Sequence, residues 1–86
     1  MAMRTTPAGA TMDTIALDLR GLKCPLPVLR VRKALGAATA GSVLVVQCTD
    51  PMAAIDLPNL VRETGDLIER QPGEGRTLVF HIRKAA

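Results

Sequence analysis

The stretch TIALDLRGLKCPLPVLRVRKALGAA, residues 14–38, has one periodicity before its single cysteine and a different one after it. Apolar residues alternate with other residues from Thr14 to Leu19, which is the pattern of a half-buried strand. From Pro25 to Ala38 the apolar residues recur instead at helical spacing. The residues of this stripe are Val28, Val31, Leu35 and Ala38. The stretch therefore predicts a strand, a break at Gly21 and a helix, with Cys24 at the junction.

The downstream sequence predicts three more strands. Residues 42–49 form a strongly apolar run, with Leu44, Val46 and Cys48 on one face of the predicted strand. Two shorter strands are predicted at 67–71 and 77–83, and the proline and glycine residues between them predict a hairpin turn.

A second helix is predicted between these strands, at residues 52–63. Pro58 lies inside it, so we expect a short first turn and then a restart of the helix. Gly65 is expected to end the helix. The resulting order, β-α-β-α-β-β, predicts an α+β fold: a two-layer sandwich in which two helices pack on one face of a four-stranded mixed sheet.

The composition is that of one small domain with an N-terminal tail. The chain has 86 residues, of which 48% are hydrophobic, and this is enough for one modest core. Residues 1–13 contain one arginine and no long apolar run, so we expect a flexible tail that is neither a signal peptide nor a membrane span. Phe80 is the only Phe, Tyr or Trp, which argues against the base-stacking surfaces of single-strand nucleic-acid binding proteins.

Positive charge gathers in the sequence around Cys24. The formal net charge is +3, and no acidic residue occurs between Asp18 and Asp50. The basic residues in this region are Arg20, Lys23, Arg30, Arg32 and Lys33. They fit either an ordinary solvated helix face or a positive surface that stabilises a thiolate and attracts acidic partners. RNA binding through this surface receives less weight, because no recognition motif accompanies it.

Cys24 is the candidate catalytic residue. A helix that needed only a cap would carry Ser, Thr, Asp or Asn here. A thiol at a helix N-terminus, beside cations such as Arg20 and Lys23, is expected to have a lowered pKa. A dithiol oxidoreductase would carry its second cysteine three residues on, where this chain has Pro27, so the pattern favours a single thiol that accepts a sulfane sulfur and hands it on. The alternative is a buried, inert cysteine that happens to begin a helix.

Most other polar residues predict structure rather than chemistry. Cys48 is expected in the core, and a resolving role for it depends on its distance from Cys24. Asp50 is expected to cap the second helix, Asp56 to face a partner or solvent, and Asp18 to brace the loop before the cysteine. Two cysteines and one histidine are too few for a structural zinc site, so no metal and no cofactor are expected.

The residues around Cys24 also match a known family. LDLRGLKCPLP, residues 17–27, followed by RKAL at 32–35, resembles the signature of the TusA/SirA-like sulfur-carrier proteins. The resemblance extends over about Thr14 to Lys84 and implies a sulfur-carrier domain at residues 14–86 with the two-layer sandwich described above. It implies that Cys24 carries sulfur as a persulfide. The expected supporting or partner-binding residues are Arg20, Lys23, Pro25 and Pro27.

The resemblance implies partners as well. Members of the family accept persulfide sulfur from a cysteine desulfurase or a rhodanese-like protein and relay it to an acceptor protein. The destinations are tRNA 2-thiolation, molybdenum-cofactor assembly and sulfur oxidation. We therefore expect a monomeric, cytoplasmic sulfurtransferase-type carrier that neither inserts into membranes nor binds nucleic acid directly. The alternative hypothesis is a non-catalytic interaction module whose basic helix face docks an acidic protein or RNA.

Overall fold

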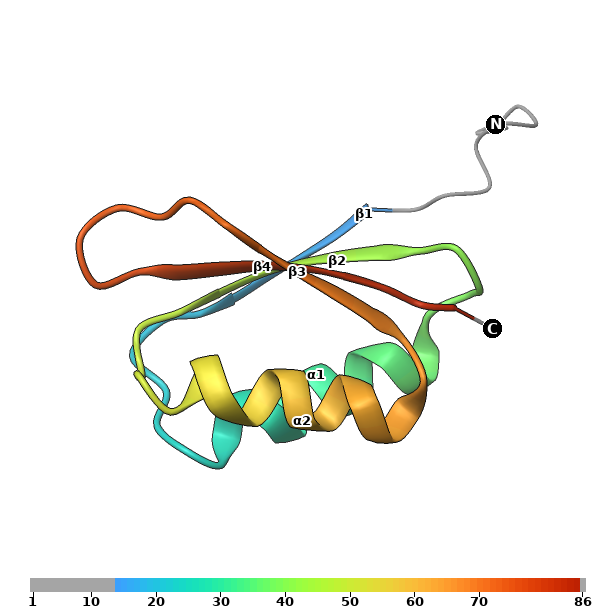
Figure 1. The fold of residues 1–86 in the computed structure, drawn as a ribbon, viewed down its shortest axis with the longest axis horizontal. Coiled ribbons are helices and arrows are strands. Elements are labelled where there is room, and N and C mark those ends of the chain that lie inside the picture. Colours follow the sequence, from blue (N-terminus) through green and yellow to red (C-terminus); the bar gives the residue numbers. More distant parts are fainter. Residues whose placement is uncertain (1–13, 86) are drawn as a thin grey trace, which may run out of the picture.

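The computed structural model describes residues 14–85, which form six elements in the predicted order. The strands are β1 (Thr14–Leu19), β2 (Val43–Cys48), β3 (Leu67–Gln71) and β4 (Leu78–Arg83), and the helices are α1 (Leu26–Ala37) and α2 (Ala53–Thr64). Both helices lie on one face of the sheet (Figure 1), so the predicted α+β sandwich is confirmed. The flexible tail predicted for residues 1–13 lies outside the described residues.

The sheet is mixed, with the strand order β1-β2-β4-β3. β1 and β2 are parallel, whereas β4 is antiparallel to both of its neighbours. Leu19 lies opposite Cys48 in the β1–β2 pair, so these two strands end at the same edge of the sheet. The loop that follows β1 and the loop that follows β2 therefore begin side by side.

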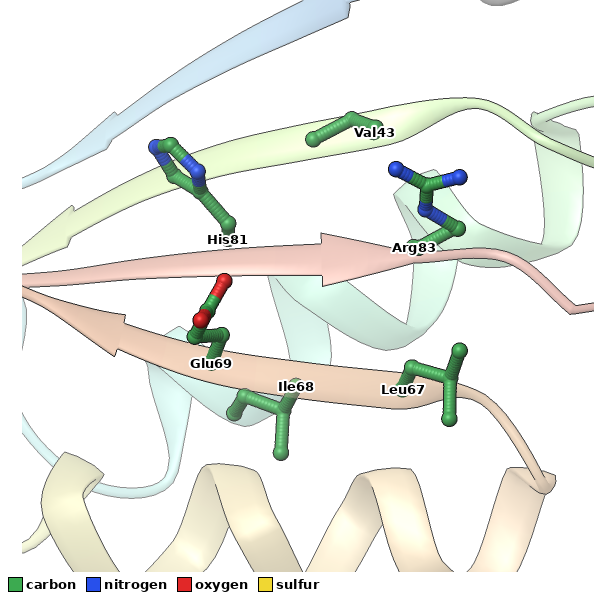
Figure 2. A pocket seen from close by; sticks show the side chains of 6 residues that line it. All are labelled: Val43, Leu67, Ile68, Glu69, His81 and Arg83. Atoms are coloured by element: carbon green, nitrogen blue, oxygen red, sulfur yellow. The ribbon is translucent and has the colours of Figure 1, made fainter.

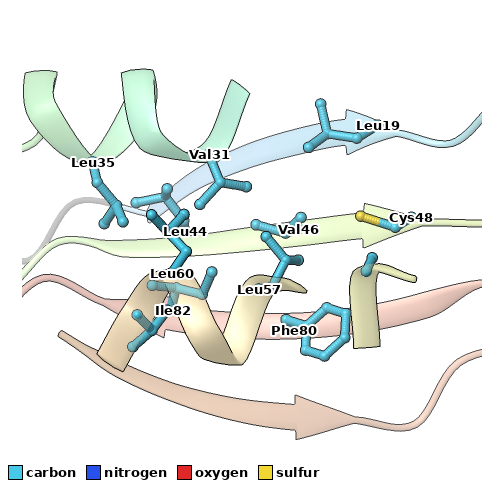
Figure 3. Close-up of a cluster of buried hydrophobic side chains, with 12 residues drawn as sticks. Leu19, Val31, Leu35, Leu44, Val46, Cys48, Leu57, Leu60, Phe80 and Ile82 are labelled. Carbon is cyan, nitrogen blue, oxygen red and sulfur yellow. The ribbon is translucent and has the colours of Figure 1, made fainter. Parts of the chain in front are cut away.

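One hydrophobic core fills the space between the sheet and the helices (Figure 3). Leu44, Val46 and Cys48 of β2 are fully buried, as their alternation predicts. The remaining core residues are Leu19, Val31, Leu35, Ala53, Leu57, Leu60, Val61, Phe80 and Ile82. Burial of one large aliphatic or aromatic side chain contributes about 1.5–3 kcal/mol, so this cluster is the main source of stability in the domain.

Helix α2 is continuous through Pro58, and the predicted interruption at this residue is wrong. A proline inside a helix costs about 3 kcal/mol, because it has no N–H and its ring crowds the preceding turn. Its neighbours Leu57, Leu60 and Val61 are almost completely buried against the sheet, and this burial outweighs the cost. Gly65 ends the helix as predicted, with a φ of 82° and its N–H donating to the Val61 carbonyl at 2.9 Å.

Helix α1 begins one residue later than the sequence predicts. Pro25 is its N-cap residue and Leu26 its first helical residue, and the peptide bond between Cys24 and Pro25 is cis. Neither α1 nor α2, the two helices among residues 14–85, has the length and apolar character needed to cross a membrane.

Candidate functional site

Two loops that are far apart in the sequence meet beside Cys24. The loop after β1 carries the cysteine, and the loop after β2 leads into α2. The Gly21 N–H donates to the Thr49 hydroxyl oxygen at 2.9 Å and so ties the two loops together. Gly21 has a φ of 87°, a left-handed conformation that costs glycine little because it has no Cβ. This tie brings the Cys24 segment close to the start of α2.

Cys24 is exposed and makes two hydrogen bonds to carboxylates. Its Sγ donates to Oδ2 of Asp56 at 3.1 Å, and its backbone N–H donates to Oδ2 of Asp50 at 2.5 Å. The other oxygen of Asp50 accepts the N–H of Met52, the N-cap residue of α2, at 3.0 Å. The prediction that Asp50 caps α2 is wrong, because Met52 is the N-cap residue and no side chain caps the helix. Asp50 lies two residues earlier, where its carboxylate links the backbone of the N-cap residue to the backbone of the cysteine.

These carboxylates raise the pKa of the Cys24 thiol, so the prediction of a lowered pKa is wrong. The hydrogen bond to Asp56 is the largest cause, followed by desolvation and by the negative charges of Asp56 and Asp50. The first turn of α1 does little to offset them. Its two prolines have no N–H, and the Leu26 N–H already donates to the Lys23 carbonyl at 2.8 Å.

Two of the basic residues near Cys24 in the sequence are paired with acids. Arg20 donates to both oxygens of Asp18, at 2.7 and 2.8 Å, and this pair raises the pKa of Arg20 and lowers the pKa of Asp18 to about 2. Arg32 of α1 pairs with Glu63 of α2 at 3.2 Å. The first pair braces the loop before the cysteine, as predicted for Asp18, and the second joins the two helices.

The other predicted supporting residues lie in different surroundings. Lys23 is exposed, and its charge adds to the two backbone N–H groups that lower the pKa of Asp50. Pro25 is exposed beside the thiol, whereas Pro27 is fully buried. Pro27 therefore packs inside the domain, and of these two prolines only Pro25 is exposed.

A shallow groove of about 280 Å³ lies between α1 and α2, with the thiol in its wall. Its lining residues are Cys24, Pro25, Val28, Arg32, Asp56, Asn59, Leu60 and Glu63. Several large apolar side chains are exposed where the two helices begin, namely Leu26, Leu29, Met52 and Ile55. Apolar surface of this kind is what protein partners cover at the centre of an interface.

A second hollow, also of about 280 Å³, lies on the other side of the molecule, over β2, β3 and β4 (Figure 2). His81 and Glu69 are partners in the β3–β4 pair and line it together with Val43, Leu67, Ile68 and Arg83. It contains no cysteine. Among residues 14–85, no three His, Cys, Asp or Glu side chains are placed to hold a metal ion. The groove beside Cys24 is therefore the better candidate for chemistry.

Cys48 is confirmed as a core residue. Its side chain is fully buried, and this burial is the main reason why its pKa is raised to about 11. Cys48 and Cys24 are both free thiols, so no disulfide joins them. A thiol that is both buried and weakly acidic reacts slowly at neutral pH. Of the two thiols, only that of Cys24 is exposed.

Sequence reasoning did not identify Asp56 as the neighbour of Cys24. The two residues lie 32 positions apart, and a charge count along the chain finds only the cations next to the cysteine. The signal that was available is topological: two parallel strands end at one edge of a sheet, so the start of the helix after the second strand lies near the loop after the first.

Comparisons with known proteins agree on one family. Residues 15–84 match the family model described as sulfurtransferase TusA. The sulfur carrier protein TusA of Allochromatium vinosum is 41% identical over 69 residues, which cover 80% of this chain and 91% of that protein. TusA of Pseudomonas entomophila is 39% identical over 70 residues, which cover 81% of this chain and 88% of that protein. The crystal structure of a SirA-like protein from Desulfitobacterium hafniense superposes with a TM-score of 0.74 at 26% identity, over 84% of this chain and 99% of that one.

Proposed function

The chain belongs to the sulfurtransferase TusA family, and from this premise we propose that Cys24 accepts sulfane sulfur as a persulfide and hands it to an acceptor protein. The observation that carries the proposal is the exposed thiol of Cys24 in the wall of the groove between α1 and α2. The only other cysteine of the chain, Cys48, is buried. The two TusA relatives named above are sulfur carriers by name, and a carrier needs one accessible thiol.

The proposed transfer is an exchange of the terminal sulfur between a persulfide and a thiol. The Cys24 thiolate attacks the terminal sulfur of a donor persulfide, and a bond forms between these two sulfur atoms. The S–S bond of the donor breaks, and the donor cysteine leaves as a thiolate that takes up the proton released by Cys24. Transfer to the acceptor repeats the same exchange with Cys24 as the leaving group. No net oxidation occurs, so no cofactor is required.

This chemistry makes the protein dependent on two partners. A cysteine desulfurase or a rhodanese-like protein is the proposed donor, because both present sulfur as a cysteine persulfide. The side chains of Leu26, Leu29, Met52 and Ile55 are exposed where the two helices begin, and they are the proposed apolar contact for donor and acceptor in turn. A monomer in a reducing compartment such as the cytoplasm suits this role, since the thiol has to stay free between transfers.

Intact-protein mass spectrometry after incubation with polysulfide tests the proposal. We expect the wild-type protein to gain the mass of one sulfur atom, and a reductant to remove it. Cys24→Ser should gain nothing, while the matched variant Cys48→Ser should load like the wild type. Loading of Cys24→Ser would contradict the assignment of the carrier cysteine. No loading of any variant, with partner binding retained in Cys24→Ser, would favour the alternative of a docking module.

A further inference from the structure

We propose that Asp56 is a positioning residue of this carrier, which holds the unloaded Cys24 as a hydrogen-bonded thiol and promotes release of sulfur from the loaded cysteine. The inference rests on the function proposed above, and it concerns the two states of the same site. Asp56 would thereby set how readily the protein gives up its sulfur.

The backbones of both Cys24 and Asp56 are fixed by hydrogen bonds, which keeps their side chains in contact. Asp56 lies in the first turn of α2, where its N–H donates to the Met52 carbonyl at 2.8 Å, and the next residue, Leu57, is fully buried against the sheet. On the other side, the Cys24 backbone is fixed by the bond from its N–H to Asp50. The distance of 3.1 Å between Sγ and Oδ2 therefore joins two anchored groups.

In the unloaded state this arrangement favours the protonated thiol. A carboxylate oxygen accepts hydrogen bonds and offers none in return, so it bonds the S–H of the thiol and repels a thiolate. The pKa of Cys24 is accordingly raised, first by the hydrogen bond to Asp56. The empty carrier is then a poor target for alkylation and oxidation, because both begin with the thiolate.

In the loaded state the same carboxylate has the opposite effect. The sulfur bonded to Cβ no longer carries a proton, so the hydrogen bond to Asp56 is lost. The terminal sulfur of a persulfide is anionic near neutral pH, and this places two negative charges close together. The acceptor thiol passes its proton to the persulfide, and the acceptor thiolate that results attacks the terminal sulfur. The S–S bond breaks, and Cys24 leaves as a thiolate that takes the proton back from the new acceptor persulfide, which restores the hydrogen bond to Asp56. Asp56 thus stabilises the empty state and destabilises the loaded one.

The other charged groups of the site do not cancel this effect. Asp50, in the loop that follows β2, adds a second negative charge that raises the pKa of the thiol. Of the cations, Arg32 lines the groove from α1 but is paired with Glu63. Lys23, from the loop that carries the cysteine, lowers the pKa of Asp50. Because negative charges dominate around the sulfur, the charge of Asp56 sets the relative stability of the empty and the loaded cysteine.

The equilibrium test mixes the protein with known ratios of glutathione persulfide to glutathione and measures the loaded fraction by intact-protein mass spectrometry. Asp56→Asn keeps the shape of the side chain and removes its charge, so we expect half-loading at a ratio roughly three- to tenfold lower than in the wild type. Asp56→Ser should shift in the same direction. Glu69→Gln, which removes the same charge from β3 on the far side of the sheet, should match the wild type. An unchanged or higher half-loading ratio in Asp56→Asn overturns the inference.

A second measurement does not depend on sulfur loading. The rate of alkylation of Cys24 by iodoacetamide, followed from about pH 6 to pH 10, reports the thiolate fraction. Asp56→Asn should react roughly three- to tenfold faster than wild type at pH 7, with its inflection at lower pH, and Glu69→Gln should not. Equal profiles overturn the inference and leave the carrier function standing. Faster alkylation in a protein that no donor loads would overturn the carrier function instead, and with it the role in sulfur release.

Discussion

Leu57→Ala is the substitution whose effect on stability the structure defines best. Leu57 is 0% exposed and packs from α2 against the sheet, next in sequence to Asp56 (Figure 3). Alanine removes three carbon atoms, which at about 0.8 kcal/mol for each buried CH₂ group amounts to roughly 2.4 kcal/mol. The cavity that remains raises the expected loss to about 3 kcal/mol. A domain of this length has a total stability of roughly 4–13 kcal/mol, so the variant should still fold.

Urea unfolding followed by far-ultraviolet circular dichroism measures this loss, because the chain has no Trp or Tyr for fluorescence. With an m value of about 1 kcal/mol/M, the midpoint should fall by about 3 M. Leu67→Ala is the matched control: Leu67 is 60% exposed, and its truncation should cost less than about 0.5 kcal/mol. A loss below about 1 kcal/mol for Leu57→Ala, or equal losses for both variants, would refute the packing of α2 that places Asp56 beside the thiol.

Three further outcomes follow from the structure. Iodoacetamide should add once to the native protein, at Cys24, and should reach Cys48 only in denaturant. Intact-protein mass spectrometry counts the adducts, and two adducts in the native state would contradict the burial of Cys48. Gly65→Ala should lower the stability by about 1 kcal/mol, because φ at this residue is 82°. Gly36→Ala, inside α1, should raise the stability by about 0.5–1 kcal/mol. Thermal unfolding that shifts in the same direction for both variants would be inconsistent with these two backbone conformations. The ion pair of Asp18 lowers its pKa from 3.8 to about 2 on folding, so its stabilising effect is complete above about pH 4 and is lost as the pH falls towards 2. Asp18→Asn should therefore make the free energy of unfolding slightly less sensitive to acid in this range, and an unchanged profile would argue against the pair in solution.

The fold could be predicted from the sequence because burial on one face leaves a period in the chain. The alternation along β2 and the helical stripe of α1 both record which side chains face the core. Pro58 shows where this local reasoning fails. Proline predicts a break from its own chemistry, but whether the helix breaks depends on the burial of Leu57, Leu60 and Val61, which is a property of the packed domain.

The structure exposes the cysteine that the sequence singled out, but the electrostatic surroundings of this cysteine differ from the prediction. Cys24 stood out because a thiol is an unusual residue at the start of a helix, and the structure places it exposed there. The expected positive surroundings came from Arg20 and Lys23, the cations nearest in sequence. Arg20 instead pairs with Asp18, two residues before it, and folding brings Asp56 to the sulfur from 32 positions away, a contact that no local pattern of charge could show. The pKa of the thiol therefore depends on tertiary contacts.

Transfer from one protein to another tests the central claim most directly. A cysteine desulfurase in catalytic amount, with cysteine as its substrate, would be incubated with the carrier, and the products would be digested with trypsin, which separates Cys24 from Cys48 into different peptides. The account predicts one additional sulfur atom, removable by reductant, on the peptide that contains Cys24 and none on the peptide that contains Cys48. Sulfur on the Cys48 peptide, or no transfer to Cys24 from desulfurases or rhodanese-like donors that load other thiols, would contradict it.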